Sequence, residues 1–202
     1  MRLDLTKLPV RQAYRWLTST IMPRPIAWVS TISAEGKTNL APFSFFQGVS
    51  SAPPTLLFIP VNTRDGSKKD TVLNLEQVPE FVVNSVPFSL AEKMNATSAT
   101  LPYGESEFAA FGVESVAADL VRPPRVAEAP ISFECRVHSI VPVGEGPLAA
   151  HVVIGLILQV HAKDEVMGED GFPDPGKLDL IGRMGGNAYS RTTERFELER
   201  PR

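Results

Sequence analysis

Residues 24–46 read Arg-Pro-Ile-Ala-Trp-Val-Ser-Thr-Ile-Ser-Ala-Glu-Gly-Lys-Thr-Asn-Leu-Ala-Pro-Phe-Ser-Phe-Phe, and this stretch determines the fold that we expect. It holds two runs rich in β-branched and aromatic residues, 26–32 and 39–46, with Gly36 in the polar break between them. Such runs on either side of a glycine-containing break predict two strands joined by a turn. A third run of the same kind, at 55–59, follows two consecutive prolines. The domain therefore begins with three strands in succession.

The second of these runs has an unusual composition for a strand in a protein core. Pro42 has no backbone N–H to donate to a sheet, and Asn39 and Ser44 place small polar groups beside aromatic residues. Apolar walls that carry a few hydroxyl and amide groups are typical of ligand-binding clefts. We therefore expect residues 39–46 to line a ligand site.

The remainder of the chain supplies further strands. We expect strands at 80–86, 131–141 and 151–161, and the last two read as a hairpin because 144–147 contains two glycines and a proline. Five or six strands with sparse helices predict a mainly β protein, with one antiparallel β-barrel domain over residues 1–202.

A few short helices are expected at the periphery of this barrel. Residues 9–17 begin with a proline, which suits a first helical turn, and residues 70–78 carry apolar residues at mostly helical spacing. Asp70 is the expected N-cap of the second helix. Ser89 is the expected start of a third helix, where Glu92 completes a capping box.

The overall composition excludes several kinds of partner. Lys and Arg total 20 against 23 Asp and Glu, for a net charge of -3, whereas a nucleic-acid partner requires a basic surface. No apolar run approaches the roughly 20 residues that cross a membrane, and no signal peptide is evident at the start. The single cysteine, Cys135, excludes an intrachain disulfide and fits a reducing compartment, so we expect a cytoplasmic protein.

Residues 68–71, Lys-Lys-Asp-Thr, open the second expected helix and are a candidate anion site. A helix N-terminus presents free N–H groups and the positive end of a dipole, and Lys69 and Thr71 add a charge and a hydroxyl. This combination suits one phosphate group. The alternative is a solvated turn with an aspartate cap, and the spacing alone does not choose between the two.

Other candidate motifs carry less information. The glycine-rich segment 182–186 is interpreted as a flexible turn before a final strand. The spacings of the three histidines match no metal-binding pattern, and Cys135 and His138 would face opposite sides of a strand. We therefore expect no metal site. The nucleophile motif of serine hydrolases is also missing from the sequence.

A series of ordered motifs runs through nearly the whole chain, from about residue 20 to 200. The motifs lie at residues 24–31, 39–46, 50–54, 69–71, 81–84, 94–97, 123–126, 134–138 and 183–189. Taken together, this series resembles the flavin reductase-like family of FMN-binding split-barrel proteins. Several motifs at consistent separations are far more specific than any one of them.

The resemblance implies a homodimer of split β-barrels that holds one FMN per protomer near the dimer interface. It implies that the isoalloxazine and ribityl groups are lined by Ser30, Thr31, Asn39, Ala41, Pro42, Ser44 and Phe45. It also implies a phosphate end formed by Lys69, Asp70 and Thr71, in agreement with the anion site expected at the helix start. Further matches extend the cofactor site to Trp28, Arg183 and Tyr189.

One position departs from the pattern of the relatives that use a nicotinamide. Those reductases carry a histidine five residues before a glycine of the long strand, and this glycine corresponds to Gly155. Position five before it is Ala150, whereas His151 is one residue away and would face the opposite side of a strand. Direct use of NAD(P)H is therefore open, while FMN binding is not affected.

Three functions follow from these observations. The first is an FMN-dependent oxidoreductase that passes reducing equivalents between NAD(P)H and a flavin or another small molecule, with the flavin supplying the redox chemistry. The second is an FMN electron carrier or flavin-binding protein without a nicotinamide pocket. The third is an interaction module that has lost its cofactor, which the presence of Ser44, Lys69 and Thr71 disfavours.

Overall fold

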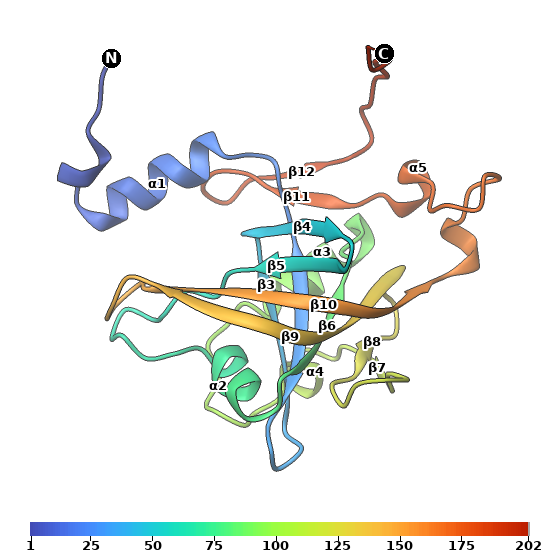
Figure 1. The fold of residues 1–202 in the computed structure, drawn as a ribbon, viewed down its shortest axis with the longest axis horizontal. Helices are drawn as coiled ribbons and strands as arrows, with labels where there is room; N and C mark the ends of the chain where they lie inside the picture. Colours follow the sequence, from blue (N-terminus) through green and yellow to red (C-terminus); the bar gives the residue numbers. More distant parts are fainter. Residues whose placement is uncertain (202) are drawn as a thin grey trace.

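The computed structural model describes residues 1–201, and its centre is one antiparallel sheet (Figure 1). Its strands are β2 (Ala27–Ile32), β3 (Thr38–Phe43), β4 (Phe46–Ser51), β5 (Pro54–Phe58), β6 (Glu80–Asn84), β9 (Ile131–Val143) and β10 (Ala150–Ala162). The strand order is β3-β2-β6-β9-β10-β5-β4, and every neighbouring pair is antiparallel. The predicted mainly β, antiparallel class is therefore confirmed.

The two edge strands of this sheet, β3 and β4, follow each other directly in the chain. Within residues 1–201 they form no ladder with one another, so the sheet is open at this seam and is not a closed barrel. The turn between them contains Ser44 and Phe45, and the Ile59 N–H donates to the Phe45 carbonyl at 3.0 Å.

Helices and short strands surround the sheet. The helices are α1 (Val10–Thr20), α2 (Asp70–Gln77), α3 (Ala91–Ala96), α4 (Glu107–Ala110) and α5 (Pro175–Leu178), with 3-10 turns at Leu5–Lys7, Phe88–Leu90 and Asp164–Val166. The short strands are β1 (Arg24–Pro25), β7 (Ser115–Val116), β8 (Arg125–Val126), β11 (Ile181–Arg183) and β12 (Tyr189–Arg191). None of the helices in residues 1–201 combines the length and apolar character that a membrane crossing requires.

The last part of the chain forms more structure than expected. The segment 182–186, interpreted above as a turn before one final strand, contains the end of β11 and leads into β12. These two strands join β1 in a small sheet of order β1-β11-β12. Figure 1 shows this sheet beside α1 at one end of the molecule, while α2 and α4 lie at the opposite end.

Each face of the large sheet carries its own hydrophobic core. One core surrounds Trp28 and includes Phe108 from α4. The other includes Val29, Phe58 and Phe81, and the rings of the last two have centroids 5.2 Å apart. The neighbours Trp28 and Val29 lie in different cores because successive strand residues point to opposite faces. Side chains that alternate along β2 therefore have different surroundings.

Gly155 on β10 has a packing role in the second core. A Cβ atom at this position would lie 2.3 Å from Cζ of the fully buried Phe81. Atoms cannot approach so closely in a dense protein interior, so any side chain here would displace the ring. The Phe81 ring is therefore sufficient to explain why a residue without a side chain occupies position 155.

The starts of two helices differ from the expectation. α2 begins with Asp70 as its first residue and has Lys69 as its N-cap, so the predicted aspartate cap is wrong. α3 begins at Ala91 after a 3-10 turn over Phe88–Leu90, so the predicted Ser89 capping box is also wrong. Within residues 1–201 the Lys69 side chain makes no capping hydrogen bond to the first turn of α2, so N–H groups there remain for another acceptor.

Candidate functional site

Among residues 1–201 the edge strand β3 pairs only with β2, so one side of its backbone is free of sheet hydrogen bonds. The Leu40 N–H points to this side and donates to Glu107 Oε2 on α4 at 2.8 Å. Pro42, two residues later, has the same orientation but no N–H to leave unpaired. The carbonyl groups of both residues point to the same free side, because the two polar groups of a strand residue lie on one side. The free edge therefore offers mainly acceptors to a ligand.

Two predicted site residues on β2 are used inside the fold. Trp28 is fully buried, and its indole N–H donates to Thr97 Oγ1 at 2.9 Å. Ser30 is also fully buried, and its hydroxyl donates to the Pro124 carbonyl at 2.5 Å. The structure thus separates these two side chains from Thr31, which faces the other side of the strand.

A network of hydroxyl and amide groups lies at the start of β3. Asn39 Nδ2 donates to Thr71 Oγ1 at 3.1 Å and to Thr31 Oγ1 at 3.4 Å. Asn74 Nδ2 donates to the same Thr31 oxygen at 3.0 Å, and the Tyr103 hydroxyl donates to Asn74 Oδ1 at 3.2 Å. Both threonines are at most 1% exposed. The network brings three of the predicted site residues together, although the threonine hydroxyls are covered.

Two carboxyl groups lie near the N-terminus of α2. Burial raises the pKa of Asp70, against its own backbone N–H and the nearby Lys69. Burial also raises the pKa of Glu107, whose side chain accepts the Leu40 N–H, and the charge of Asp70 acts in the same direction. Both shifts have the same main cause, which is the removal of the carboxyl groups from water.

The two lysines before α2 have different surroundings. Lys68 forms an ion pair with Glu76, whereas no ion pair within residues 1–201 involves the exposed Lys69. Lys69 and the uncapped first turn of α2 therefore remain available to an anion. A small polar cleft runs beside them and is lined by Ser33, Lys37, Thr38, Asn39, Asp70, Asn74, Tyr103, Gly104 and Glu105.

The other end of β3 leads into an aromatic and positively charged turn. Arg24 Nε donates to Ser44 Oγ at 3.3 Å, and the guanidinium carbon lies 5.8 Å from the centre of the Phe45 ring. Tyr14 of α1 meets the same ring edge-on, with centroids 6.5 Å apart. Ala41, Pro42, Ser44 and Phe45 are only partly buried, so a ligand can reach all four.

Arg183 and Tyr189 lie at this same end, because β11 pairs with β1 in a register that sets Arg183 opposite Arg24. The Arg183 guanidinium stacks over the Tyr189 ring, 4.4 Å from its centre. The Tyr189 hydroxyl donates to Asn95 Oδ1 at 3.0 Å. These contacts fix the two side chains relative to each other and to α3.

Apart from Trp28 and Ser30, the predicted residues therefore form two groups, one toward each end of β3. Asn39 and Ser44 are five residues apart, which is roughly 17 Å at the rise of an extended strand. One group is polar and carries the free Lys69, whereas the other is aromatic and carries guanidinium groups. A flavin mononucleotide has a phosphate at one end and an aromatic ring system at the other. The residues fit this molecule in both order and chemistry.

Residues 18–176 match the family described as flavin reductase like domain. The chain belongs to the flavin reductase-like family. A relative from Deinococcus radiodurans is 41% identical over 98% of this chain and 88% of its own length.

Solved structures of similar proteins span the whole chain. Nitrilotriacetate monooxygenase component B from Bacillus cereus has a TM-score of 0.92 and 31% identity, and the match covers 98% of each chain. The 2-nitrobenzoate 2-nitroreductase of Pseudomonas fluorescens has a TM-score of 0.87 and 29% identity over 100% of this chain and 96% of its own. Flavoredoxin of Desulfovibrio vulgaris shares the fold, with a TM-score of 0.76 and 18% identity over 98% and 97% of the two chains.

The sequence analysis did not identify three residues that lie at the two ends of β3. Arg24 stands in the motif that carries the family resemblance, but a single arginine before a proline gives no sign of its contacts. Glu107 and Tyr103 lie in the weakly patterned region around residues 100–110, where the sequence shows no periodicity. Their positions depend on how α4 and its preceding loop pack against β3.

The sequence also missed a cluster of titratable side chains away from β3. Ligating atoms of Asp119, Glu134 and His161 lie within 4.8 Å of one another. The Glu134 oxygens accept the N–H groups of Asp119 at 2.7 Å and Leu120 at 2.6 Å, and one oxygen contacts His161 Nε2 at 2.5 Å. Burial opposes ionisation of Glu134, but these hydrogen bonds outweigh it and hold its pKa below the usual value. The carboxylate thus ties the loop before β8 to the β9–β10 hairpin.

Proposed function

We propose that the protein is an FMN-binding flavoprotein that acts as an oxidoreductase. The observation that carries the proposal is the arrangement of the two groups along β3, with a free lysine and an uncapped helix start at one end and an accessible aromatic turn at the other. Two of the similar solved structures are a monooxygenase component and a nitroreductase, and their redox activities support this proposal.

In this proposal the chain binds and orients the cofactor, and bound FMN supplies the hydride or electron transfer. Lys69 and the first-turn N–H groups of α2 would bind the phosphate. Ala41 and Pro42 would contact the flavin along the free edge of β3, where the Leu40 and Pro42 carbonyls are available acceptors. Ser44 and Phe45 would meet the ring system. The Thr31–Asn39–Thr71 network would support the phosphate end from behind rather than touch the ligand, because both threonines are covered.

The electron donor distinguishes the enzyme from its alternative. The proposed donor is NAD(P)H, and the proposed acceptor is a flavin or another small molecule. One observation favours a carrier without a nicotinamide site: His151 is only 8% exposed, and its Nε2 lies 2.8 Å from Asn62 Oδ1. Burial lowers the pKa of this imidazole, and the Asn62 amide is fixed by the Gly66 and Gly146 carbonyls. His151 is thus engaged within the fold.

Two measurements on the purified protein test these alternatives. A flavin absorbance band, released as FMN on denaturation, is expected if the cofactor assignment is correct, and a colourless protein that does not take up added FMN contradicts it. Rapid mixing of the FMN-loaded protein with NADH or NADPH then separates the two functions. Bleaching within a turnover time supports the reductase, whereas bleaching by dithionite alone supports the carrier.

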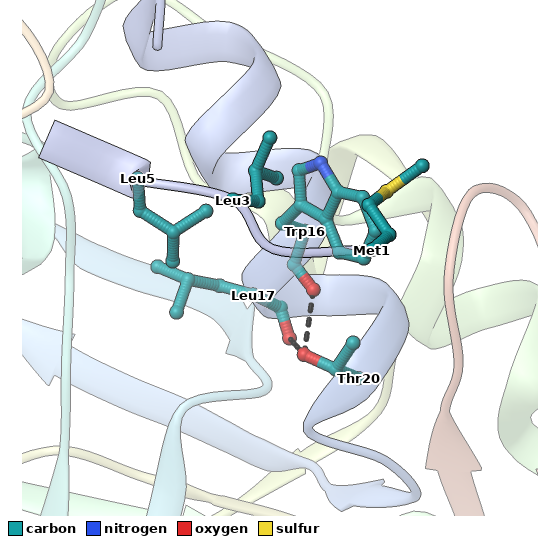
Figure 2. A pocket seen from close by; sticks show the side chains of 6 residues that line it. All are labelled: Met1, Leu3, Leu5, Trp16, Leu17 and Thr20. Atoms are coloured by element: carbon teal, nitrogen blue, oxygen red, sulfur yellow. Dashed lines mark hydrogen bonds between the residues drawn. The ribbon is translucent and has the colours of Figure 1, made fainter. Parts of the chain in front are cut away.

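We also propose that the protein is a cytoplasmic homodimer whose interface includes α1. Apolar side chains of this helix are unusually exposed, including Val10 at 63% and Tyr14 at 53%. Figure 2 shows an apolar pocket at this helix, lined by Met1, Leu3, Leu5, Trp16, Leu17 and Thr20. Contiguous exposed apolar surface is typical of interaction sites. Because Tyr14 contacts Phe45, a second chain on α1 would also cover the ring end of the proposed site.

A further inference from the structure

Arg24 is a buried cation at the ring end of the proposed site. The residue is 5% exposed, and four hydrogen bonds fix its guanidinium group. Nη1 donates to the Thr18 and Ile21 carbonyls, both at 2.7 Å, and Nη2 donates to the Met184 carbonyl at 3.1 Å. The fourth bond runs from Nε to Ser44 Oγ at 3.3 Å. Arg24 thus joins the end of α1, the segment after β11 and the turn after β3.

All four acceptors of Arg24 are neutral. Within residues 1–201 no carboxylate lies at ion-pair distance from it. Burial lowers the pKa of Arg24, and the neighbouring Arg183 adds to this effect, although Tyr14 opposes it. An arginine nevertheless keeps its proton in a protein. The site therefore holds a positive charge that no acidic side chain compensates, and such a charge interacts strongly with its surroundings in a region that excludes water.

The bond from Arg24 also determines how Ser44 can interact with a ligand. A hydroxyl group has one hydrogen to donate and lone pairs that accept. Because Ser44 Oγ accepts the Arg24 Nε–H, its own hydrogen points elsewhere, and no acceptor for it is found within residues 1–201. Ser44 and its neighbour Phe45 are both partly exposed. It is thus presented to a ligand as a hydrogen-bond donor.

We propose that Arg24 is a positioning residue that raises the reduction potential of the bound flavin. The inference rests on the proposed function. Two-electron reduction of a flavin with uptake of one proton leaves negative charge on the ring system. The uncompensated guanidinium group and the donor hydroxyl of Ser44 both stabilise this charge more than they stabilise the neutral oxidised ring. A protein that holds FMN beside Arg24 therefore binds the reduced form more tightly than the oxidised form.

The test measures the midpoint potential of FMN bound to the purified full-length protein, by equilibration with redox dyes. Arg24→Gln is expected to lower the preference for reduced over oxidised FMN by about 10- to 100-fold, which is about 30 to 60 mV for a two-electron couple. Ser44→Ala is expected to lower it by about tenfold, or about 30 mV. Arg24→Lys keeps the charge and is expected to lower the potential less than Arg24→Gln does. Arg125→Gln is the matched control, because within residues 1–201 the Arg125 side chain bonds only the Ala117 carbonyl.

A purely structural role for Arg24 gives a different result. Arg24→Gln would then weaken both redox forms of FMN equally and lower the melting temperature, with the potential unchanged. That outcome overturns the inference. An unchanged potential in Ser44→Ala also overturns it, and this second variant provides the test if Arg24→Gln does not fold. Failure of the wild-type protein to bind FMN would overturn the proposed function itself. Binding with unaltered potentials in the variants would overturn only the role of Arg24.

Discussion

Lys68 and Lys69 are adjacent residues with different surroundings, and this difference allows a controlled test of the phosphate site. Lys69 is free of ion pairs within residues 1–201, whereas Lys68 is paired with Glu76. If Lys69 meets the phosphate of FMN, the charge-assisted bond is worth roughly 1.5–3 kcal/mol. Lys69→Ala is then expected to weaken FMN binding by about 10- to 100-fold, because each 1.4 kcal/mol is tenfold.

Riboflavin, which lacks the phosphate, is the control ligand for this prediction, and its affinity should not change in Lys69→Ala. Lys68→Ala is the control variant and should bind both flavins nearly as the wild type does. Titration by fluorescence quenching measures all of these affinities. An equal loss for FMN and riboflavin would show that this helix start does not hold the phosphate.

Gly155 gives a second prediction at the residue scale, on the stability of the fold. A methyl group at this position would overlap the buried ring of Phe81. We expect Gly155→Ala to lower the free energy of unfolding by about 1–3 kcal/mol, the usual effect of overpacking a core. Chemical denaturation monitored by fluorescence measures the change.

Gly48→Ala provides the comparison, because a Cβ atom at Gly48 meets nothing within 4 Å. Its effect should stay within about 0.5 kcal/mol, as for most surface substitutions. Replacing Phe81 by Leu in the Gly155→Ala background should recover part of the loss. If Gly155→Ala were as stable as the wild type, the ring would not be the reason for the glycine.

At the scale of elements, Glu134 links the β9–β10 hairpin to the loop at Asp119 and Leu120. Its folded-state pKa lies below the unfolded value, so the ionised group stabilises the fold above the unfolded pKa. This contribution is lost as the pH falls through the folded pKa. Glu134→Gln removes the charge and one acceptor, so we expect it to lower the free energy of unfolding by about 1–3 kcal/mol at pH 7.

The pH dependence identifies the cause of that loss. The difference between wild type and Glu134→Gln should shrink as the pH falls from neutral to the acidic range, because the wild-type carboxylate becomes protonated. Denaturation curves recorded at several pH values measure this trend. A difference that stays constant with pH would indicate a packing defect rather than the loss of a charged hydrogen-bond acceptor.

The elements also show where prediction from the sequence works. Strands such as β2 and β10 were predicted nearly at their observed bounds, because runs 26–32 and 151–161 combine β-branched residues with clear turn signals at their ends. The strand β4 was missed, because residues 46–51 lack such a run and the predicted strand 39–46 covers β3 together with the turn after it. The helix starts were wrong at Asp70 and Ser89, because a preceding extended residue or 3-10 turn moves the cap by one position. Local patterns thus determine the strands but not the exact ends of short helices.

The candidate site was predictable only in part. The period of two along β2 already implies that Ser30 and Thr31 face opposite sides and have different surroundings. The roles of Arg24 and Glu107 were not visible, because each depends on contacts between segments far apart in the chain. The sequence also could not show that the sheet stays open between β3 and β4. The residues of an edge strand do not reveal whether it pairs with the strand at the opposite edge.

At the scale of the whole molecule, the exposed apolar side of α1 predicts association. Sedimentation equilibrium of the FMN-loaded protein is expected to give twice the 22.0 kDa mass of one chain. Leu17→Glu, which places a charge among the apolar side chains of the pocket at α1, is expected to weaken the dimer. Lys7→Glu, on the neighbouring exposed 3-10 turn, serves as the control. A stable monomer that still holds FMN would contradict the proposed interface.

The strand order has a consequence for how the chain folds. The N-terminal strands β2–β3 and β4–β5 lie at the two ends of the sheet, and the C-terminal hairpin β9–β10 lies between them. Because β5 pairs with β10, and β2 reaches β9 only through β6, the sheet cannot be completed before the hairpin has left the ribosome. Pairing over such long sequence separations is slow. The apolar strands that are synthesised first therefore remain exposed until the hairpin is available. The nascent chain is the state in which we expect aggregation and chaperone binding.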